Sequence, residues 1–350
     1  MKIKNYLNKS LYDFKSYEIS KPMQRINLGS NESPFNLMED EYFKSGYTEI
    51  LSDLDLNRYP DPASSELRAE IANYVNVDSD NIIMGCGADE VINMILATFV
   101  NPGEIVITHS PSFEMYKISS KIVHAEIVEV EDREYEIDID SIIEKANHLD
   151  AKIVFLCTPN NPTGYIIPAD EVQRLIDNTK CIVVLDIAYI EFSDEQYSDL
   201  NLNERVIRLR TLSKAFGLAS LRVGYAIADE SIIRAINLVR PPYNLNELSQ
   251  RLALFTVKNR DKIFKYIEKI KLEKNRFTKI ITEMGYEVLP SSANFVLLKV
   301  ENSKEFSEKL KSENIRIRTY SPESSLKDYY RISVGLPEEN DEIIRLLRGD

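Results

Sequence analysis

The stretch Ile182-Val183-Val184-Leu185-Asp186 is a short apolar run that ends in a carboxylate. A continuous Val/Ile/Leu run predicts a strand covered on both faces, as in parallel sheets. Further strands are expected at 81–85, 104–108, 126–130, 153–157, 206–210 and 223–228. Helical patterns lie between the strands, at 88–100, 113–121, 139–146 and 170–177. This alternation predicts an α/β fold with a mainly parallel sheet.

The pattern changes after about residue 245. A long charged helical pattern over 247–283 precedes several short strands and one further helix, which is an α+β pattern. The adjacent Pro241 and Pro242 break helices and mark the boundary. We therefore expect three parts. An N-terminal arm, packed on the small domain or on a partner subunit, covers residues 1–30. A large domain covers 31–240, and a small C-terminal domain covers 241–350.

Composition excludes several classes of protein. The chain of 350 residues has 43 Lys and Arg against 56 Asp and Glu, a net charge of −13. This balance argues against nucleic acid or an anionic membrane as the main partner, so an anionic ligand must be met by specific arginines. The start of the chain has no signal-peptide pattern and no apolar run is long enough to span a membrane. The three cysteines lack a CxxC spacing and the three histidines are scattered, so we expect a cytoplasmic protein without a metal site.

The segment Thr211-Leu212-Ser213-Lys214, with Arg222 eight residues after the lysine, suggests covalent chemistry. A lysine beside hydroxyls that can bind phosphate suits a Schiff base with an aldehyde cofactor that carries a phosphate. Pyridoxal phosphate (PLP) is such a cofactor. A solvated lysine in a polar turn is the structural alternative.

A second segment, Gly85-Cys86-Gly87-Ala88-Asp89-Glu90, follows a strand and opens a helix. Glycines there let the backbone approach a phosphate, and the first amides of the helix are free to donate. Glu90 stands where a dinucleotide-binding motif needs its third glycine, so a nucleotide site is disfavoured. A tight strand-to-helix turn is the alternative reading of this segment.

Polar residues also follow two of the expected strands. Asn161 lies in Asn160-Asn161-Pro162-Thr163-Gly164, directly after the strand at 153–157, where open α/β sheets bind ligands. Asp186 ends its own strand and could keep a pyridine nitrogen protonated, and Tyr189 could donate to a ring oxygen. A turn, a strand-end acid and a half-buried tyrosine are the structural alternatives.

Two arginines are candidates for binding an anion. Arg331 lies inside an apolar strand pattern, where its charge is costly to bury without an anionic partner. Its planar fork suits a carboxylate or a phosphate. Arg318 is a similar case, and for both residues a structural salt bridge is the alternative.

Taken in chain order, these and other stretches form a set of motifs. The set is Asn31-Glu32-Ser33-Pro34, Arg58-Tyr59-Pro60, Gly87-Ala88-Asp89-Glu90, Pro111-Ser112-Phe113, Asn161-Pro162-Thr163-Gly164, Asp186-Ile187-Ala188-Tyr189, the Lys214 segment, Arg240-Pro241-Pro242-Tyr243-Asn244 and Arg331-Ile332-Ser333-Val334-Gly335. Over nearly its whole length the chain resembles the fold-type I PLP-dependent aminotransferases and, within them, the histidinol-phosphate aminotransferase family. The resemblance implies a PLP-dependent transferase fold, with a mainly parallel seven-stranded sheet in the large domain and a smaller α+β domain.

The resemblance also implies a role for each matching residue. The catalytic residues would be Lys214, Asp186 and Tyr189, with Lys214 carrying a proton between the substrate and the cofactor. The cofactor would be held by Ala88, Asp89, Phe113, Asn161, Asp186, Tyr189, Thr211, Ser213, Lys214 and Arg222, and by Tyr59 from the other subunit of a homodimer. The substrate would be bound by Arg331, Arg318, Asn31 and Tyr17.

The reaction that the resemblance implies is a step of histidine biosynthesis. L-Histidinol phosphate and 2-oxoglutarate would be interconverted with imidazole-acetol phosphate and L-glutamate in a ping-pong transamination. Three alternatives stay open: an aminotransferase for aromatic or other amino acids, a lyase like the threonine-phosphate decarboxylases, and a non-catalytic PLP-binding module. The chain departs from many relatives at two positions. Ile187 stands where they have glutamate, and we expect no catalytic loss from this change. Phe113 stands where they have tyrosine or tryptophan, so stacking is retained and only a hydrogen bond from the aromatic ring is lost.

Overall fold

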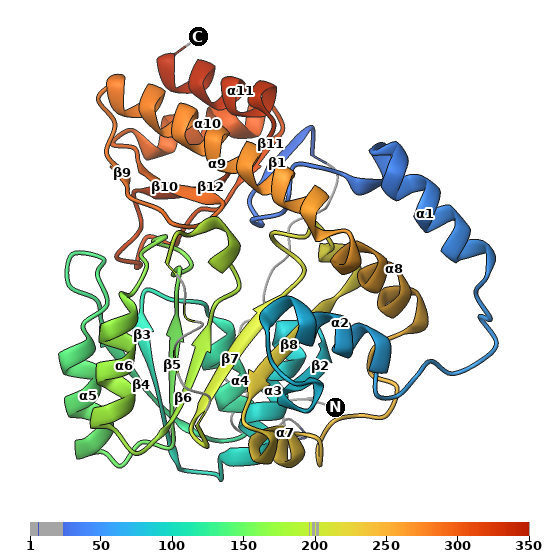
Figure 1. Ribbon diagram of the computed structural model, residues 1–350. Helices are drawn as coiled ribbons and strands as arrows, with labels where there is room; N and C mark the ends of the chain where they lie inside the picture. Colours follow the sequence, from blue (N-terminus) through green and yellow to red (C-terminus); the bar gives the residue numbers. More distant parts are fainter. Residues whose placement is uncertain (1–5, 7–23, 196, 198–199, 201–202, 350) are drawn as a thin grey trace.

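The computed structural model describes residues 6, 24–195, 197, 200 and 203–349 (Figure 1). Its centre is a seven-stranded sheet with the strand order β2-β8-β7-β6-β5-β3-β4. The strands are β2 (Ile82–Cys86), β3 (Ile105–Ser110), β4 (Glu126–Glu131), β5 (Ile153–Cys157), β6 (Ile182–Asp186), β7 (Val206–Thr211) and β8 (Val223–Ala228). The expected α/β fold with a seven-stranded sheet is confirmed.

Only β8 runs against the other strands of this sheet, since it pairs antiparallel with both β2 and β7. The pairs β3–β4, β3–β5, β5–β6 and β6–β7 are parallel. In register, Cys157 lies opposite Asp186, and Asp186 lies opposite Leu209. The carboxyl ends of the central strands therefore meet at one edge of the sheet, where ligands bind in open α/β folds.

Helices cover both faces of the sheet, which explains the continuous apolar runs. Val154 and Leu156 of β5 pack with α5 and α6 on one face, while Ile153 and Phe155 pack with α3, α4 and α7 on the other (Figure 1). These helices are α3 (Ala88–Phe99), α4 (Met115–Ile122), α5 (Ile139–His148), α6 (Ala169–Asn178) and α7 (Glu230–Ile236). Three-residue 3-10 turns lie at Leu37–Glu39, Ser79–Asn81, Ile190–Phe192 and Ala219–Leu221.

A smaller unit lies above the carboxyl edge of the large sheet (Figure 1). It contains a three-stranded antiparallel sheet of β9 (Val288–Leu289), β10 (Phe295–Lys299) and β12 (Tyr329–Ser333). It also contains a parallel pair of β1 (Ile26–Leu28) and β11 (Ile315–Ile317). The N-terminal β1 is thus joined to the C-terminal part of the chain, and we retain the division at residues 30 and 240 as a proposal.

The helices outside the large sheet are α1 (Glu41–Ser52), α2 (Ser65–Val75), α8 (Glu247–Lys258), α9 (Arg260–Glu283), α10 (Ser303–Ser312) and α11 (Pro337–Arg348). The helix expected over 247–283 is broken at Asn259, whose backbone leaves helical geometry with φ −108° and ψ 26°. Asn259 caps α8 by donating from its side chain to the Phe255 carbonyl. No described helix combines the length and the apolar character needed to cross a bilayer.

Candidate active site

A cavity of about 300 Å³ opens at the carboxyl edge of the large sheet, between that edge and the smaller unit. Many of the residues that the sequence predicted for a site line it together. They are Asn31, Ala88, Asp89, Phe113, Asn161, Asp186, Tyr189, Thr211, Ser213, Lys214, Arg222, Arg318 and Arg331. The structure therefore gathers residues from both ends of the chain around one cavity.

Lys214 follows β7 and its amine lies inside the cavity. Nζ donates a hydrogen bond to the carbonyl of Ser30, 2.8 Å away, in the segment that follows β1. Desolvation and, as the second cause, the positive charge of Arg331 lower the pKa of Lys214 to about 8. Near neutral pH this amine is therefore deprotonated far more often than an exposed lysine, which a nucleophile or a general base requires.

Asp186 ends β6 and is buried. Burial raises the pKa of Asp186 to about 6, although a hydrogen bond from Tyr116 acts to lower it. The Tyr116 hydroxyl donates to Oδ2 at 2.5 Å, and the Ala188 amide donates to Oδ1 at 3.1 Å. Two donors thus fix the carboxylate at the cavity wall and favour its ionised form.

Tyr116 was not identified from the sequence. It lies three residues after Phe113, in the first turn of α4, and its ring stacks on Phe155 at 4.8 Å between centroids. The helix expected over 113–121 would have placed Tyr116 on the same face as Phe113, because residues three apart share one face of a helix. The helix begins at Met115, later than expected, and Phe113 precedes it.

Tyr189 lies just after β6 on the side of the cavity that faces the smaller unit. Its hydroxyl accepts a hydrogen bond from Asn31 Nδ2 at 3.0 Å, and burial raises the pKa of Tyr189 well above its usual value. Asn31 is itself held by Ser333, whose Oγ accepts from the Asn31 amide at 2.8 Å. Asn31 has a left-handed backbone, with φ 53°, which asparagine tolerates better than most residues.

The part of the cavity next to the N-terminus of α3 can hold an anion. Gly87 is the N-cap residue of α3 and has no side chain that could accept a hydrogen bond from the amides of Ala88 and Asp89. A Cβ at Gly87 would lie 2.4 Å from Arg222 Nη2, and a Cβ at Gly224 would lie 2.3 Å from the Ala88 nitrogen. Only glycines fit at these two positions.

Hydroxyls and a guanidinium complete this anion site. Thr211 Oγ1 donates to Ser213 Oγ at 3.0 Å, and Arg222 Nη2 forms an ion pair with Asp89 at 3.1 Å. The arginine side chain is about half exposed, so the pair itself contributes little to stability. The arrangement matches the requirements of a phosphate group, which binds helix amides, hydroxyls and arginine.

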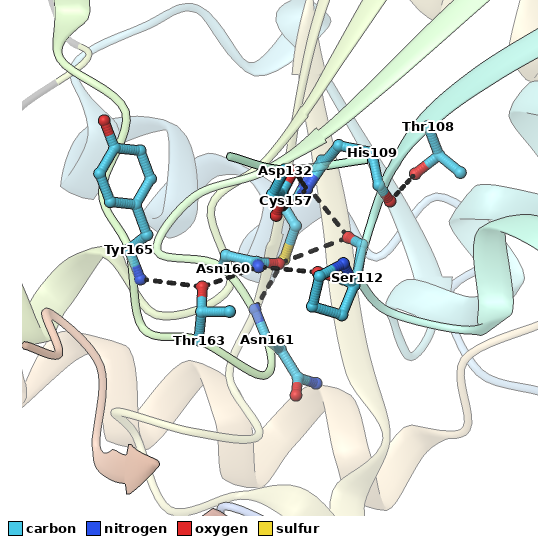
Figure 2. Close-up of polar contacts among 10 residues, drawn as sticks. Thr108, His109, Ser112, Asp132, Cys157, Asn160, Asn161, Thr163 and Tyr165 are labelled. Carbon is cyan, nitrogen blue, oxygen red and sulfur yellow. Dashed lines mark hydrogen bonds and ion pairs between the residues drawn. The ribbon is translucent and has the colours of Figure 1, made fainter. Parts of the chain in front are cut away.

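A buried network around His109 includes Ser112 and Cys157, which both line the cavity (Figure 2). His109 Nδ1 lies 3.2 Å from Asp132 Oδ1, and its Nε2 lies 3.2 Å from Ser112 Oγ and accepts from the Cys157 amide at 3.4 Å. Because Nε2 accepts, the proton is on Nδ1 and is donated to Asp132. The network ties the turn before Phe113 to the end of β5.

Asn160 extends the same network into the following loop (Figure 2). Its Nδ2 donates to the Pro111 carbonyl and to Thr163 Oγ1, both at 2.9 Å. The next residue, Asn161, donates its backbone amide to Cys157 Sγ at 3.4 Å, and it lines the cavity. Within the described residues, no group of His, Cys, Asp and Glu side chains could hold a metal ion.

Arg331 crosses the cavity from β12. Its Nη2 donates to the Gly29 carbonyl at 2.7 Å and its Nη1 donates to Asn161 Oδ1. Its Nε is buried and has no hydrogen-bond partner among the described residues. A buried donor without a partner is costly, and a carboxylate entering the cavity would satisfy it. Arg318 lies beside this group, with Nη2 3.6 Å from Glu114 Oε2.

One predicted residue within the described part of the chain, Tyr59, does not line this cavity. Tyr59 is 81% exposed and its ring stacks on Tyr243, with centroids 4.5 Å apart. Tyr17 lies outside the described residues. Arg316, which the sequence analysis did not select, does line the cavity.

Comparisons with known proteins agree with this geometry. Residues 24–347 match the family model described as "Aminotransferase class I and II". A histidinol-phosphate aminotransferase from Caldanaerobacter subterraneus subsp. tengcongensis is 39% identical over 352 residues, which cover 99% of each chain. Among solved structures, the histidinol-phosphate aminotransferase of Sinorhizobium meliloti in complex with pyridoxal-5'-phosphate has a TM-score of 0.83 at 25% identity, covering 93% of this chain and 92% of that one.

One solved structure shares the fold and has another activity in its title. The L-threonine-O-3-phosphate decarboxylase of Porphyromonas gingivalis has a TM-score of 0.79 at 24% identity, covering 93% of this chain and 98% of that one. At this identity the likeness concerns the fold alone. The family match over nearly the whole chain, together with the full-length relative, leads to one conclusion: this chain belongs to the aminotransferase class I and II family.

Proposed function

We propose that this protein is a PLP-dependent aminotransferase that interconverts L-histidinol phosphate and 2-oxoglutarate with imidazole-acetol phosphate and L-glutamate. The observation that carries the proposal is the Lys214 amine, whose pKa is lowered to about 8 inside a cavity that also holds Asp186 and Arg331. A neutral amine, a buried acid and an arginine are the groups that transamination needs. The name of the Caldanaerobacter relative supports the choice of substrates.

The cavity fits pyridoxal phosphate by the chemistry of its donors. The amides of Ala88 and Asp89, the hydroxyls of Thr211 and Ser213, and Arg222 would hold the phosphate. Gly87 and Gly224 allow Arg222 and the Ala88 amide to come this close to the neighbouring backbone. Phe113 would cover the ring, and Asn161 and Tyr189 would face the ring oxygen. When bound, this cofactor supplies an electron sink for the bonds at the substrate α-carbon.

Lys214 would act as the base in the proposed reaction. Its neutral Nζ would accept the proton of the substrate α-carbon and return it on the other side of the transfer. The hydrogen bond to the Ser30 carbonyl marks the position that the amine occupies between the two halves of the site. Because Ser30 directly follows β1, the position of the Lys214 amine depends on this N-terminal segment.

Asp186 would hold a proton on the pyridine nitrogen of the cofactor. Burial raises the pKa of Asp186 to about 6, so the residue is mostly ionised at neutral pH. Its anionic form favours a protonated partner, in an interior where charges interact strongly. Tyr116 would orient the carboxylate for this task through its 2.5 Å hydrogen bond.

Arg331 would bind the α-carboxylate of glutamate. Its buried Nε has no partner among the described residues, and a carboxylate there would complete its hydrogen bonds. We propose additional substrate contacts at Arg318, Asn31 and Tyr17. The anionic groups of the two substrates would bind to Arg331 and Arg318 in turn, one in each half-reaction. The arginines would orient each substrate over the cofactor.

The active unit is proposed to be a homodimer. Exposed apolar side chains gather in the segments around residues 56–59 and 238–243, namely Leu56, Tyr59, Leu238, Val239 and Tyr243. Of these, Tyr59 and Tyr243 stack on each other, and exposed apolar side chains that lie together are typical of a protein–protein interface. Across it, Tyr59 would reach the cofactor phosphate of the partner subunit. The cysteines, which are free thiols, are consistent with the reducing cytoplasm proposed as the location.

The proposal is tested by mixing the holoenzyme with single amino donors and following the cofactor's absorbance. L-Histidinol phosphate and L-glutamate should each convert the cofactor to its amino form, whereas L-phenylalanine should react far more slowly. Fast conversion by phenylalanine would favour an aminotransferase for aromatic amino acids. Release of carbon dioxide from threonine phosphate without an added keto acid would identify a lyase, and binding of the cofactor with no reaction at all would identify a binding module.

A further inference from the structure

Strand β11 directs two arginines to the same side of the chain. Ile315 and Ile317 are buried in the apolar core of the smaller unit. Because successive side chains of a strand alternate between its faces, Arg316 and Arg318 both point the other way. Both of them line the cavity that contains Lys214.

Arg316 reaches the cavity past Gly29. A Cβ at Gly29 would lie 3.4 Å from both Cγ and Nε of Arg316, so the arginine stem packs on the Gly29 backbone. The Gly29 carbonyl accepts from Arg331. Arg316 and Arg331 therefore approach the same residue of the chain.

The three arginines differ in their partners. Arg331 uses two of its nitrogens within the protein, and Arg318 lies near Glu114. For the Arg316 side chain the structure records neither an ion pair nor a hydrogen bond within the part of the chain that it describes. Asn27, the register partner of Arg316 in β1, donates a hydrogen bond to the Glu32 carboxylate.

The number of arginines exceeds what one carboxylate uses. A carboxylate is satisfied by one bidentate arginine, whereas a phosphate monoester carries a charge of about −1.5 to −2 at pH 7 and three acceptor oxygens. In a chain with a net charge of −13, three arginines on β11 and β12 that line one cavity, besides Arg222, are a specific local feature. The surplus cation suits a substrate that ends in phosphate.

We propose that Arg316 is a specificity-determining residue that binds the phosphate of a phosphorylated substrate and contributes little to the binding of a monocarboxylate side chain. The proposal rests on the proposed function, because it concerns substrates of the same site. It adds a discriminating contact on β11, next to Arg318.

The test compares Arg316→Gln with the wild-type holoenzyme in the two half-reactions. The KM for the phosphorylated keto substrate should rise about 10- to 100-fold, the range for losing a hydrogen bond between charged groups, with kcat nearly unchanged. The KM for L-glutamate should rise by less than about 3-fold, as for an interaction between partly exposed charges. Arg316→Lys should recover part of the loss, because it keeps the charge without the planar fork.

Arg234→Gln is the matched control, since Arg234 is 70% exposed and pairs with Glu230 away from this cavity. It should leave both KM values unchanged. Equal increases for glutamate and for the phosphorylated substrate in Arg316→Gln would overturn the proposal, as would no increase for either.

A simple anion separates this proposal from the proposed function. Methyl phosphate should inhibit the glutamate half-reaction of the wild-type holoenzyme competitively, and its inhibition constant should rise about 10-fold or more in Arg316→Gln. That result would support the phosphate contact even if the wild-type protein did not act on imidazole-acetol phosphate. Absence of inhibition in the wild type, or equal inhibition in the variant, would overturn the contact.

Discussion

The two sides of the cavity are built differently. On the side of the large sheet, polar groups have internal partners: Asp186 is held by Tyr116, Thr211 donates to Ser213, and Arg222 pairs with Asp89. On the side of β11 and β12, Arg331 keeps a buried Nε without a partner among the described residues. The first side is organised before any ligand binds, whereas the second has cationic donors in need of an anion.

This difference separates two kinds of effect. Changes on the sheet side should act mainly on kcat, because they alter groups that meet the reacting atoms. Changes on the arginine side should act mainly on KM, because they remove contacts made to the bound substrate before and during the reaction. The following predictions test that division, beginning with the largest effect.

Lys214→Ala should reduce turnover by more than about 10⁴-fold, because it removes both the amine proposed to hold the cofactor and the proposed base for the α-carbon proton. The absorption band of the covalently held cofactor should disappear. Steady-state rates and the absorbance spectrum check both points. Lys279→Ala, at a residue whose side chain is 75% exposed, is the control. Retained activity in Lys214→Ala would refute the proposed function.

Asp186→Asn should lower kcat by roughly 10²- to 10³-fold, the range for losing a preorganised charged group at a reaction centre. KM for both substrates should change much less, since Asp186 lies on the sheet side and does not contact the substrate in the proposal. Full kinetic curves for both half-reactions give the two constants. A large increase in KM with unchanged kcat would contradict the division between the two sides.

Arg331→Lys should raise KM for glutamate by about 10- to 100-fold, because a lysine cannot reproduce the bidentate contact of a guanidinium. The variant also loses the donors to Gly29 and Asn161, so its thermal stability must be measured beside its kinetics. A purely structural role would lower the melting temperature and leave the KM of the remaining folded enzyme unchanged.

Tyr116→Phe should have the smallest effect on kcat at pH 8, less than about 10-fold. It should raise the pKa of Asp186 above about 6, because the hydrogen bond from Tyr116 favours the ionised carboxylate. A protonated Asp186 cannot serve the cofactor nitrogen, so activity should fall more at pH 6 than at pH 8. Profiles of kcat against pH for Tyr116→Phe and for Tyr42→Phe, an exposed control, would show the shift; coincident profiles would count against it.

The buried strands were predicted best from the sequence. The ranges 153–157, 182–186 and 223–228 agree with β5, β6 and β8 residue for residue, because these apolar runs are bounded by polar or turn-forming residues. The break between α8 and α9 was missed. Asn259 stands in a continuous helical pattern without proline or glycine, and its capping contacts depend on the folded chain.

The site was predicted less evenly. Asp186 was found because it ends an apolar strand, and Lys214 because hydroxyls and an arginine lie near it in the sequence. Tyr116 and Arg316 were missed although local periodicity pointed to both. The alternation Ile315-Arg316-Ile317-Arg318 places the two arginines on one face, yet only Arg318 was selected. The role proposed for Tyr59 requires the proposed second subunit.

The pairing of β1 with β11 has a practical consequence for work with this protein. A truncation that removes the chain through Leu28 would delete β1, the strand that pairs with β11. It would also destabilise the backbone at Gly29 and Ser30, whose carbonyls accept hydrogen bonds from Arg331 and Lys214.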